Sequence, residues 1–205
     1  MKVTRVLTLV VCLAGLSACR LSYKGGATTV GSAELSTNEN LLVASPTPVV
    51  KQKTQADCGL AALAMVAGAW GHSWSVDDLA RKVPPSKNGV KLKRLRDYAR
   101  ERGLEAYAVK GTFVDLENEL RAGRPVVLGL VLPYDQNNNL NHYEVAVAID
   151  PRDHTVITRD PATGDLMRRV KKVLDLEWKT AGYATLVVVS DRSKSKTPSM
   201  ASTGD

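Results

Sequence analysis

The chain has 205 residues, a formal charge of +7 and 44% hydrophobic residues. It holds no run of 18 apolar residues, which excludes a predicted membrane-spanning helix, and its length allows one domain with a proper core. The basic excess is local, because residues 81–102 hold nine basic and only two acidic side chains.

The first residues predict an export signal. Basic residues precede an apolar run at 6–16 that is too short to span a membrane. The segment 16–19, Leu-Ser-Ala-Cys, resembles the bacterial lipoprotein box, in which the chain is cut before the cysteine and lipid is attached to it. We therefore expect a signal peptide at 1–18 and a lipidated Cys19. An ordinary secretory signal cut at the same bond is the alternative.

The predicted anchor sets the expected location and organisation. A lipidated Cys19 would hold the protein in the bacterial cell envelope, at the periplasmic face of the outer membrane where the host has two membranes. Residues 19–48 predict a flexible tether, 49–190 a single domain, and the polar segment 191–205 a disordered tail. We expect a monomer, and nucleic acid is not an expected partner of an exported lipoprotein.

The apolar pattern changes from helical to strand-like along the domain. Helices are predicted at 58–69, from Ser75 to the break at Pro84-Pro85, at 90–102 and at 113–122. Strands are predicted at 105–110, 125–132, 143–149, 155–159 and 185–190. Helices followed mostly by strands indicate an α+β fold, with an N-terminal helical lobe packed on an antiparallel sheet.

One predicted helix carries the basic excess. The stretch Arg81–Arg102 has an apolar stripe at Leu92, Leu95 and Tyr98, with Lys and Arg on the other face. A solvated helix face explains this pattern. Contact with an anionic surface, such as lipid, polymer or an acidic substrate, is the functional alternative.

Cys58 is the candidate nucleophile. Cys12 is lost with the predicted signal and Cys19 is lipidated, so Cys58 has no disulfide partner in an oxidising compartment. It directly precedes an apolar helix, and a helix N-terminus stabilises a thiolate, the reactive form of cysteine. The alternative is a small buried hydrophobe with no chemical role.

A nucleophilic cysteine needs a base and a group that orients the base. Of the three histidines, His142 opens an apolar strand, and Asp160 ends the next one. Two antiparallel strands would bring Asp160 beside His142 and fix the tautomer of the ring. Gln52, six residues before Cys58, could donate to an oxyanion together with the Cys58 backbone N–H. A structural histidine and an ordinary Asp-Pro turn are the alternatives.

Several motifs together resemble one family. Gln52, Asp57-Cys58-Gly59, Ala61-Ala62-Leu63, His142-Tyr143 and Asp160-Pro161 are similar to the peptidase C39 family, the double-glycine leader peptidases that process bacteriocins. Over residues 47–190 the resemblance implies a papain-like fold. It also implies Cys58 as nucleophile, His142 as base, Asp160 as its orienting partner and Gln52 as oxyanion donor. It implies no metal or cofactor, and a thioester acyl-enzyme that water then opens.

The sequence therefore predicts a cysteine endopeptidase that cuts an exported protein or peptide, with Gly-Gly or other small-residue sites as candidate cleavage points. The best-known members of the family are N-terminal domains of ABC exporters, whereas this chain has an export signal and no ATP-binding loop. Leader cleavage coupled to transport is therefore not expected. Two alternatives stay open. One is a peptidyl transferase resembling phytochelatin synthase, and the other is a catalytically weak, lipid-anchored binding module for an exported partner.

Overall fold

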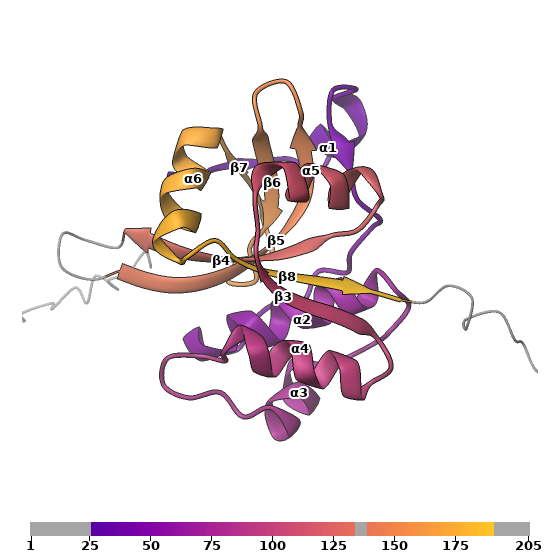
Figure 1. Cartoon of the computed structure of the whole chain (residues 1–205), viewed down its shortest axis with the longest axis vertical. Helices are drawn as coiled ribbons and strands as arrows, with labels where there is room; N and C mark the ends of the chain where they lie inside the picture. The colour runs from indigo at the N-terminus through magenta and orange to yellow at the C-terminus, as the bar shows by residue number, and fades with distance from the viewer. Residues whose placement is uncertain (1–25, 134–138, 191–205) are drawn as a thin grey trace, which may run out of the picture.

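The computed structural model describes residues 26–133 and 139–190 (Figure 1). The predicted signal peptide at 1–18, the lipidation site Cys19 and the tail at 191–205 lie outside the described residues. Among the residues described, none of the helices is both long and apolar enough to cross a membrane.

The described part of the chain contains short helices and one set of paired strands. The helices are α1 (Glu34–Thr37), the 3-10 turn η1 (Gln55–Asp57), α2 (Cys58–Gly68), α3 (Val76–Lys82), α4 (Leu92–Glu101), α5 (Phe113–Arg121) and α6 (Lys171–Thr180). The strands are β1 (Thr28–Val30), β2 (Leu42–Val43), β3 (Glu105–Lys110), β4 (Val126–Pro133), β5 (Asn139–Asp150), β6 (Thr155–Arg159), β7 (Leu166–Arg169) and β8 (Ala184–Val189).

The strands form one antiparallel sheet with β5 near its centre. The order is β1-β7-β6-β5-β4-β8-β3, and β2 pairs with β5 beside this path. The first half of β5 pairs with β4, and its last residues pair with β2 at Leu42 and Val43. The pairing of β5 with β6 shifts register between Ala146 and Ala148. Neighbours on both sides therefore hold β5 in a defined position.

Helices cover both faces of this sheet (Figure 1). Helices α2, α3 and α4 share one core with it, and α5 and α6 pack into a second core with residues of its other face. The side chains of α2 are buried nearly all round because this helix lies between its neighbouring helices and the sheet. The predicted α+β fold, a helical lobe packed on an antiparallel sheet, is confirmed. Of the two helices on the second face, α5 matches the helix predicted at 113–122, whereas α6 and the covering of a second face were not part of the prediction.

Most predicted elements are confirmed within a few residues. Helix α2 begins at Cys58, and β3 and β6 have the predicted bounds. Ser75 caps α3, because its hydroxyl accepts a hydrogen bond from the Asp78 N–H at 3.1 Å. The prediction omits β7 and α6, although Leu174 and Trp178, four residues apart and fully buried, are a helical signal.

The segment before the predicted domain differs from the expected flexible tether. Within 26–48, strand β1 pairs with β7, strand β2 pairs with β5, and Glu34 forms an ion pair with Arg168 at 2.5 Å. The expectation for 19–48 is corrected for these residues. Such a polar segment has little hydrophobic pattern of its own, and it becomes ordered by completing the backbone hydrogen bonds of sheet strands.

Candidate active site

Cys58 is the first residue of α2 and is 4% exposed. The turn η1 before it is closed by Asp57, whose carboxylate accepts hydrogen bonds from the Thr54 backbone N–H at 2.8 Å and hydroxyl at 2.9 Å. Asp57 therefore holds the turn that places Cys58 at the start of α2. Its side chain makes no capping hydrogen bond to α2 itself. The sulfur lies at the positive end of the helix dipole, which favours a thiolate.

A glycine lets the start of α2 approach β5. A Cβ on Gly59 would lie 3.0 Å from the Tyr143 ring and 3.1 Å from Leu95. A larger residue would therefore push α2 away from the strand. Because Gly59 follows Cys58 and Tyr143 follows His142, this close packing sets the separation between Cys58 and His142.

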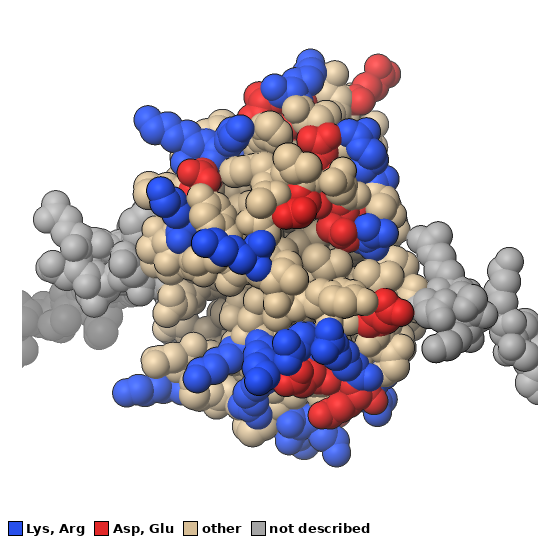
Figure 2. Space-filling model, in the orientation of Figure 1, with Lys and Arg blue, Asp and Glu red and all other residues tan. Residues whose placement is uncertain are grey.

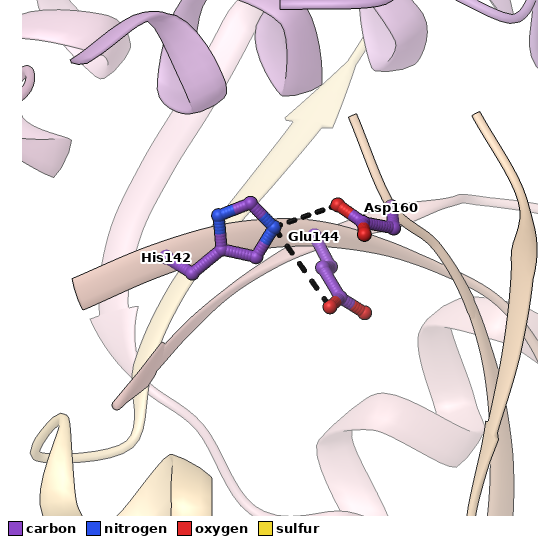
Figure 3. A group of neighbouring side chains, drawn as sticks. All are labelled: His142, Glu144 and Asp160. Atoms are coloured by element: carbon purple, nitrogen blue, oxygen red, sulfur yellow. Dashed lines mark hydrogen bonds and ion pairs between the residues drawn. The ribbon is translucent and has the colours of Figure 1, made fainter. Parts of the chain in front are cut away.

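His142 and Asp160 form a buried pair beside this cysteine. The Nε2 atom of His142 lies 2.7 Å from Asp160 Oδ1, and a hydrogen bond also joins the ring to Cys58. Figure 3 shows the second ring nitrogen, Nδ1, on the side of the ring away from Asp160, so Nδ1 is the atom left for Cys58. Asp160 Oδ1 also accepts the Ala162 N–H at 2.8 Å, which holds the carboxylate in place. Three side chains predicted from the sequence thus lie in one row.

The surroundings of His142 favour its charged form. Burial by itself lowers the pKa of the ring, but hydrogen bonds to Asp160 and Cys58 and the nearby charge of Glu144 raise it to about 10. Burial likewise opposes ionisation of Asp160, yet its contact with His142 holds the pKa of this carboxyl below its usual value. The neighbouring Tyr143 has a pKa raised to about 12, first by burial and then by the charge of Cys58. The site therefore favours a charged imidazolium beside a carboxylate.

Gln52 is held by its backbone beside the loop after β6. Its N–H donates to the Pro161 carbonyl at 2.9 Å, which ties it to the residue that follows Asp160. Its side-chain Oε1 is buried and has no hydrogen-bond partner among the described residues. Gln55, and not Gln52, is among the residues that line the cleft at Cys58. The sequence analysis did not single out Gln55.

Cys58 and His142 open onto a cleft of about 600 Å³. One wall comes from β4 and β5 and another from the loop at 86–91. A Cβ on Gly129 would lie 2.9 Å from the Ala184 Cβ, so β4 and β8 leave no room for a side chain there. Besides His142, the charged residues that line the cleft are lysines, Lys87 and Lys91. The cleft is therefore closely packed around Gly129 and basic on its other wall.

A second set of charged residues, which the sequence analysis missed, lies behind His142. Glu144 is 1% exposed, and its two carboxylate oxygens accept hydrogen bonds from the buried Arg169 at 2.5 and 2.7 Å. Arg169 also donates to Glu177 at 2.8 Å. A glutamate in the otherwise apolar run 143–149 was the signal that could have found this group.

The same neighbourhood contains atoms of the type that bind metal ions. Ligand atoms of His142, Glu144 and Asp160 lie within 4.8 Å of one another. In the described arrangement His142 Nε2 is bonded to Asp160, and both Glu144 oxygens are bonded to Arg169. Hydrogen bonds within the protein thus occupy these potential ligand atoms, which belong to an ion-pair network. We assign them no metal.

The predicted basic stretch lies on the helical lobe. Figure 2 shows Lys and Arg side chains gathered there, over the part of the molecule that holds α3 and α4, with acidic residues between them. Arg81 pairs with Asp78 and Arg96 pairs with Asp97. Part of the charge is therefore neutralised locally. Binding of this stretch to an anionic surface stays a prediction.

Comparison with known sequences places most of the described chain in one family. The profile of the Peptidase C39 family matches residues 46–191. The Colicin V secretion/processing ATP-binding protein CvaB of Escherichia coli is 30% identical over 117 residues, which are 57% of this chain and 15% of the relative. The chain therefore matches only a small part of the length of that relative.

Solved structures have the same fold. A C39-like peptidase from Bacillus anthracis superposes with a TM-score of 0.61 at 18% identity, over 73% of this chain and 98% of that one. A double glycine motif protease from an AMS/PCAT transporter, solved in complex with the leader peptide, gives a TM-score of 0.58 at 21% identity, over 72% and 94%. These likenesses confirm the predicted papain-like fold.

Proposed function

The chain belongs to the peptidase C39 family and is a cysteine peptidase, and from this premise we propose that Cys58, His142 and Asp160 are its catalytic triad. The observation that carries the proposal is the buried row of the three side chains, with His142 hydrogen-bonded to both of the others. A base held between a nucleophile and a carboxylate is the arrangement that acyl transfer requires.

The proposed reaction follows from this row. The Cys58 thiolate attacks the scissile carbonyl, and the resulting oxyanion accepts hydrogen bonds from the Cys58 backbone N–H and the Gln52 side chain. The His142 imidazolium gives its proton to the leaving amine as the C–N bond breaks, which leaves a thioester on Cys58. Neutral His142 then takes a proton from water, and the hydroxide attacks the thioester carbonyl. The C–S bond breaks, the acid product leaves, and the Cys58 thiolate and the His142 imidazolium are restored. Asp160 keeps the ring oriented in both steps.

We propose small residues at the cleavage site. The related protease solved with its leader peptide is named for a double-glycine motif, so Gly-Gly is the first sequence to test. The expected substrate is an exported protein or peptide, because the sequence predicts that the enzyme itself is exported.

Location at the cell envelope is a separate part of the proposal. It rests on the N-terminal sequence alone, where a short apolar run ends in the lipoprotein-like segment 16–19 with Cys19 at its end. Mass spectrometry of the mature protein would test it directly. A diacylated or triacylated Cys19 supports the anchor, and an unmodified N-terminus would remove it.

The first test of the triad is alkylation of Cys58 by iodoacetamide across a pH series. We expect fast reaction at about pH 6, where an ordinary thiol with a pKa of about 8.5 is almost fully protonated. We expect His142→Ala to lose this fast reaction, because the imidazolium that stabilises the thiolate is gone. His154→Ala is the matched control and should react like the parent protein. A slow thiol in the parent would instead favour the binding-module hypothesis.

Gln52 and Gln55 provide a direct test of the oxyanion donor. Gln52→Ala is expected to slow acylation by about 10²–10³, the usual cost of one lost oxyanion donor. Gln55→Ala, three residues away and in the cleft wall, should change KM more than the acylation rate. Single-turnover cleavage of a fluorogenic Gly-Gly peptide measures both. Parent-like acylation by the Gln52 variant would remove this residue from the mechanism and leave Gln55 to be examined.

A further inference from the structure

Strand geometry places a second carboxylate behind the proposed base. Residues two apart in a strand point to the same face, and Glu144 follows His142 in β5 in this way. Its Oε1 atom lies 3.9 Å from His142 Nε2, the nitrogen that is bonded to Asp160 (Figure 3). His142 is thus faced by two carboxylates, and the mechanism above uses only that of Asp160.

The Glu144 carboxylate is buried but fully compensated. Arg169, which is 0% exposed, donates to both of its oxygens, and the Thr158 hydroxyl donates to Oε2 at 2.5 Å. A buried carboxylate without such partners would take up a proton and lose its charge. Bidentate bonding to Arg169 provides these partners, because the guanidinium fork matches the two carboxylate oxygens.

Arg169 is in turn held by a second glutamate. Its Nε donates to Glu177 of α6 at 2.8 Å, and the other Glu177 oxygen accepts the Gly26 N–H at 2.9 Å. Gly26 packs against Val173 so closely that a Cβ there would lie 2.5 Å from its side chain. The network therefore runs from the segment before β1, through α6 and β7, to the strand that carries His142.

We propose that Glu144, clamped by Arg169, is a positioning residue that keeps the His142 ring charged and aligned with Asp160. This inference rests on the proposed triad, because it assigns a role through His142. The groups that act on the ring directly are Cys58 of α2, Glu144 of β5 and Asp160 after β6. Tyr143 of β5 and the two lysines of the loop at 86–91 line the same cleft as His142. Arg169 of β7 and Glu177 of α6 form the outer layer. Glu144 acts on the ring directly, whereas Glu177 reaches it only through Arg169.

This difference between the two glutamates provides a matched pair of variants. Both Glu144→Gln and Glu177→Gln remove one carboxylate from Arg169 and should lower stability. Only Glu144→Gln removes a charge that lies within 4 Å of the ring nitrogen. Its imidazole titration should therefore move to lower pH by about one unit or more, the scale for one nearby charge. The titration of His142 in Glu177→Gln should match that of the parent.

The measurement is an NMR titration of the imidazole C2–H signals between about pH 5 and 11, a range that spans free and strongly raised histidine pKa values. The chain has three histidines, so loss of one signal in His142→Ala assigns the resonance. The rate of Cys58 alkylation by iodoacetate should also fall at a lower pH in Glu144→Gln than in the parent, by the same shift as the His142 titration. Equal titrations of the Glu144 variant and the parent would overturn the inference, as would equal shifts in both glutamine variants.

A further variant keeps the test decisive if Glu144→Gln does not fold. The triple change Glu144→Gln, Arg169→Met and Glu177→Gln removes all three charges together, and complete replacement of a buried ion cluster is tolerated far better than removal of one partner. It should still shift His142 downward, but less than Glu144→Gln does, because loss of the Arg169 charge acts in the opposite direction. An unshifted ring in the triple variant contradicts the inference. Failure of the triad itself is recognised separately, because Cys58 in the parent would then react independently of His142.

Discussion

Replacing Cys58 by alanine is expected to lower turnover by about four to six orders of magnitude, the usual loss when the nucleophile of a catalytic triad is removed. No other cysteine lies within the described residues, so this part of the protein offers no second thiol to take its place. The change deletes a single sulfur from a side chain at the wall of the cleft. The fold should therefore survive.

The measurement is cleavage of a fluorogenic Gly-Gly peptide by the parent and the variant, with circular dichroism and urea unfolding as checks of the fold. Cys58→Ser is the matched control for packing, because a hydroxyl is nearly isosteric with the thiol and is a much weaker nucleophile at neutral pH. Residual cleavage by Cys58→Ala at the parent rate would disprove Cys58 as nucleophile. If Cys58→Ala loses both cleavage and the fold, Cys58→Ser decides whether the sulfur itself is needed for cleavage.

Removing the Asp160 side chain is expected to have the second-largest effect. In Asp160→Ala the ring loses its only bonded carboxylate, and turnover should fall by about 10²–10⁴ because the base is no longer oriented or stabilised as imidazolium. Asp160→Asn keeps an oxygen that can accept the Nε2–H bond but removes the charge. We expect it to retain most turnover near neutral pH and to lose activity earlier as the pH rises. An alkaline limit equal to that of the parent would show that the charge does not matter.

The same pair should make stability depend on pH in a predictable direction. The pKa of His142 is raised from 6.5 to about 10, so its stabilising contribution is complete below about pH 6.5 and disappears as the pH rises through 10. The pKa of Asp160 is lowered from 3.8, so its contribution is present above that value and is lost as the pH falls further. Urea unfolding should thus show the largest difference between the parent and Asp160→Ala between about pH 4 and 6.5. A difference that grows at alkaline pH would contradict this account.

Local sequence was sufficient for the elements that carry the proposed triad. The sequence shows a long apolar run directly after Cys58 and a second apolar run after His142, and the two elements lie within a few residues of their predicted bounds. The order of Cys58, His142 and Asp160 along the chain was enough to propose that they meet. Two adjacent antiparallel strands, β5 and β6, supply the geometry that this order suggested.

The parts that sequence reasoning missed depend on partners far away in the chain. The polar segment before residue 49 has no hydrophobic period, and it forms β1 and β2 only because strands β7 and β5 offer free backbone groups to pair with. Gln55, and not Gln52, lines the cleft, and this placement depends on the turn η1, which Asp57 closes. Neither feature has a local signature.

The residues by themselves determined the family, the fold class and the candidate nucleophile, base and orienting carboxylate, because these follow from motif order and from periodic burial of apolar side chains. Only the tertiary structure decided how the base is supported. Glu144 stands out as a glutamate in an apolar run, but its partner Arg169 is 25 residues away and looks like an ordinary charged position in the sequence. They become a buried pair because β5, β6 and β7 fold back on one another, and the low polarity of the core then requires each charge to find a partner.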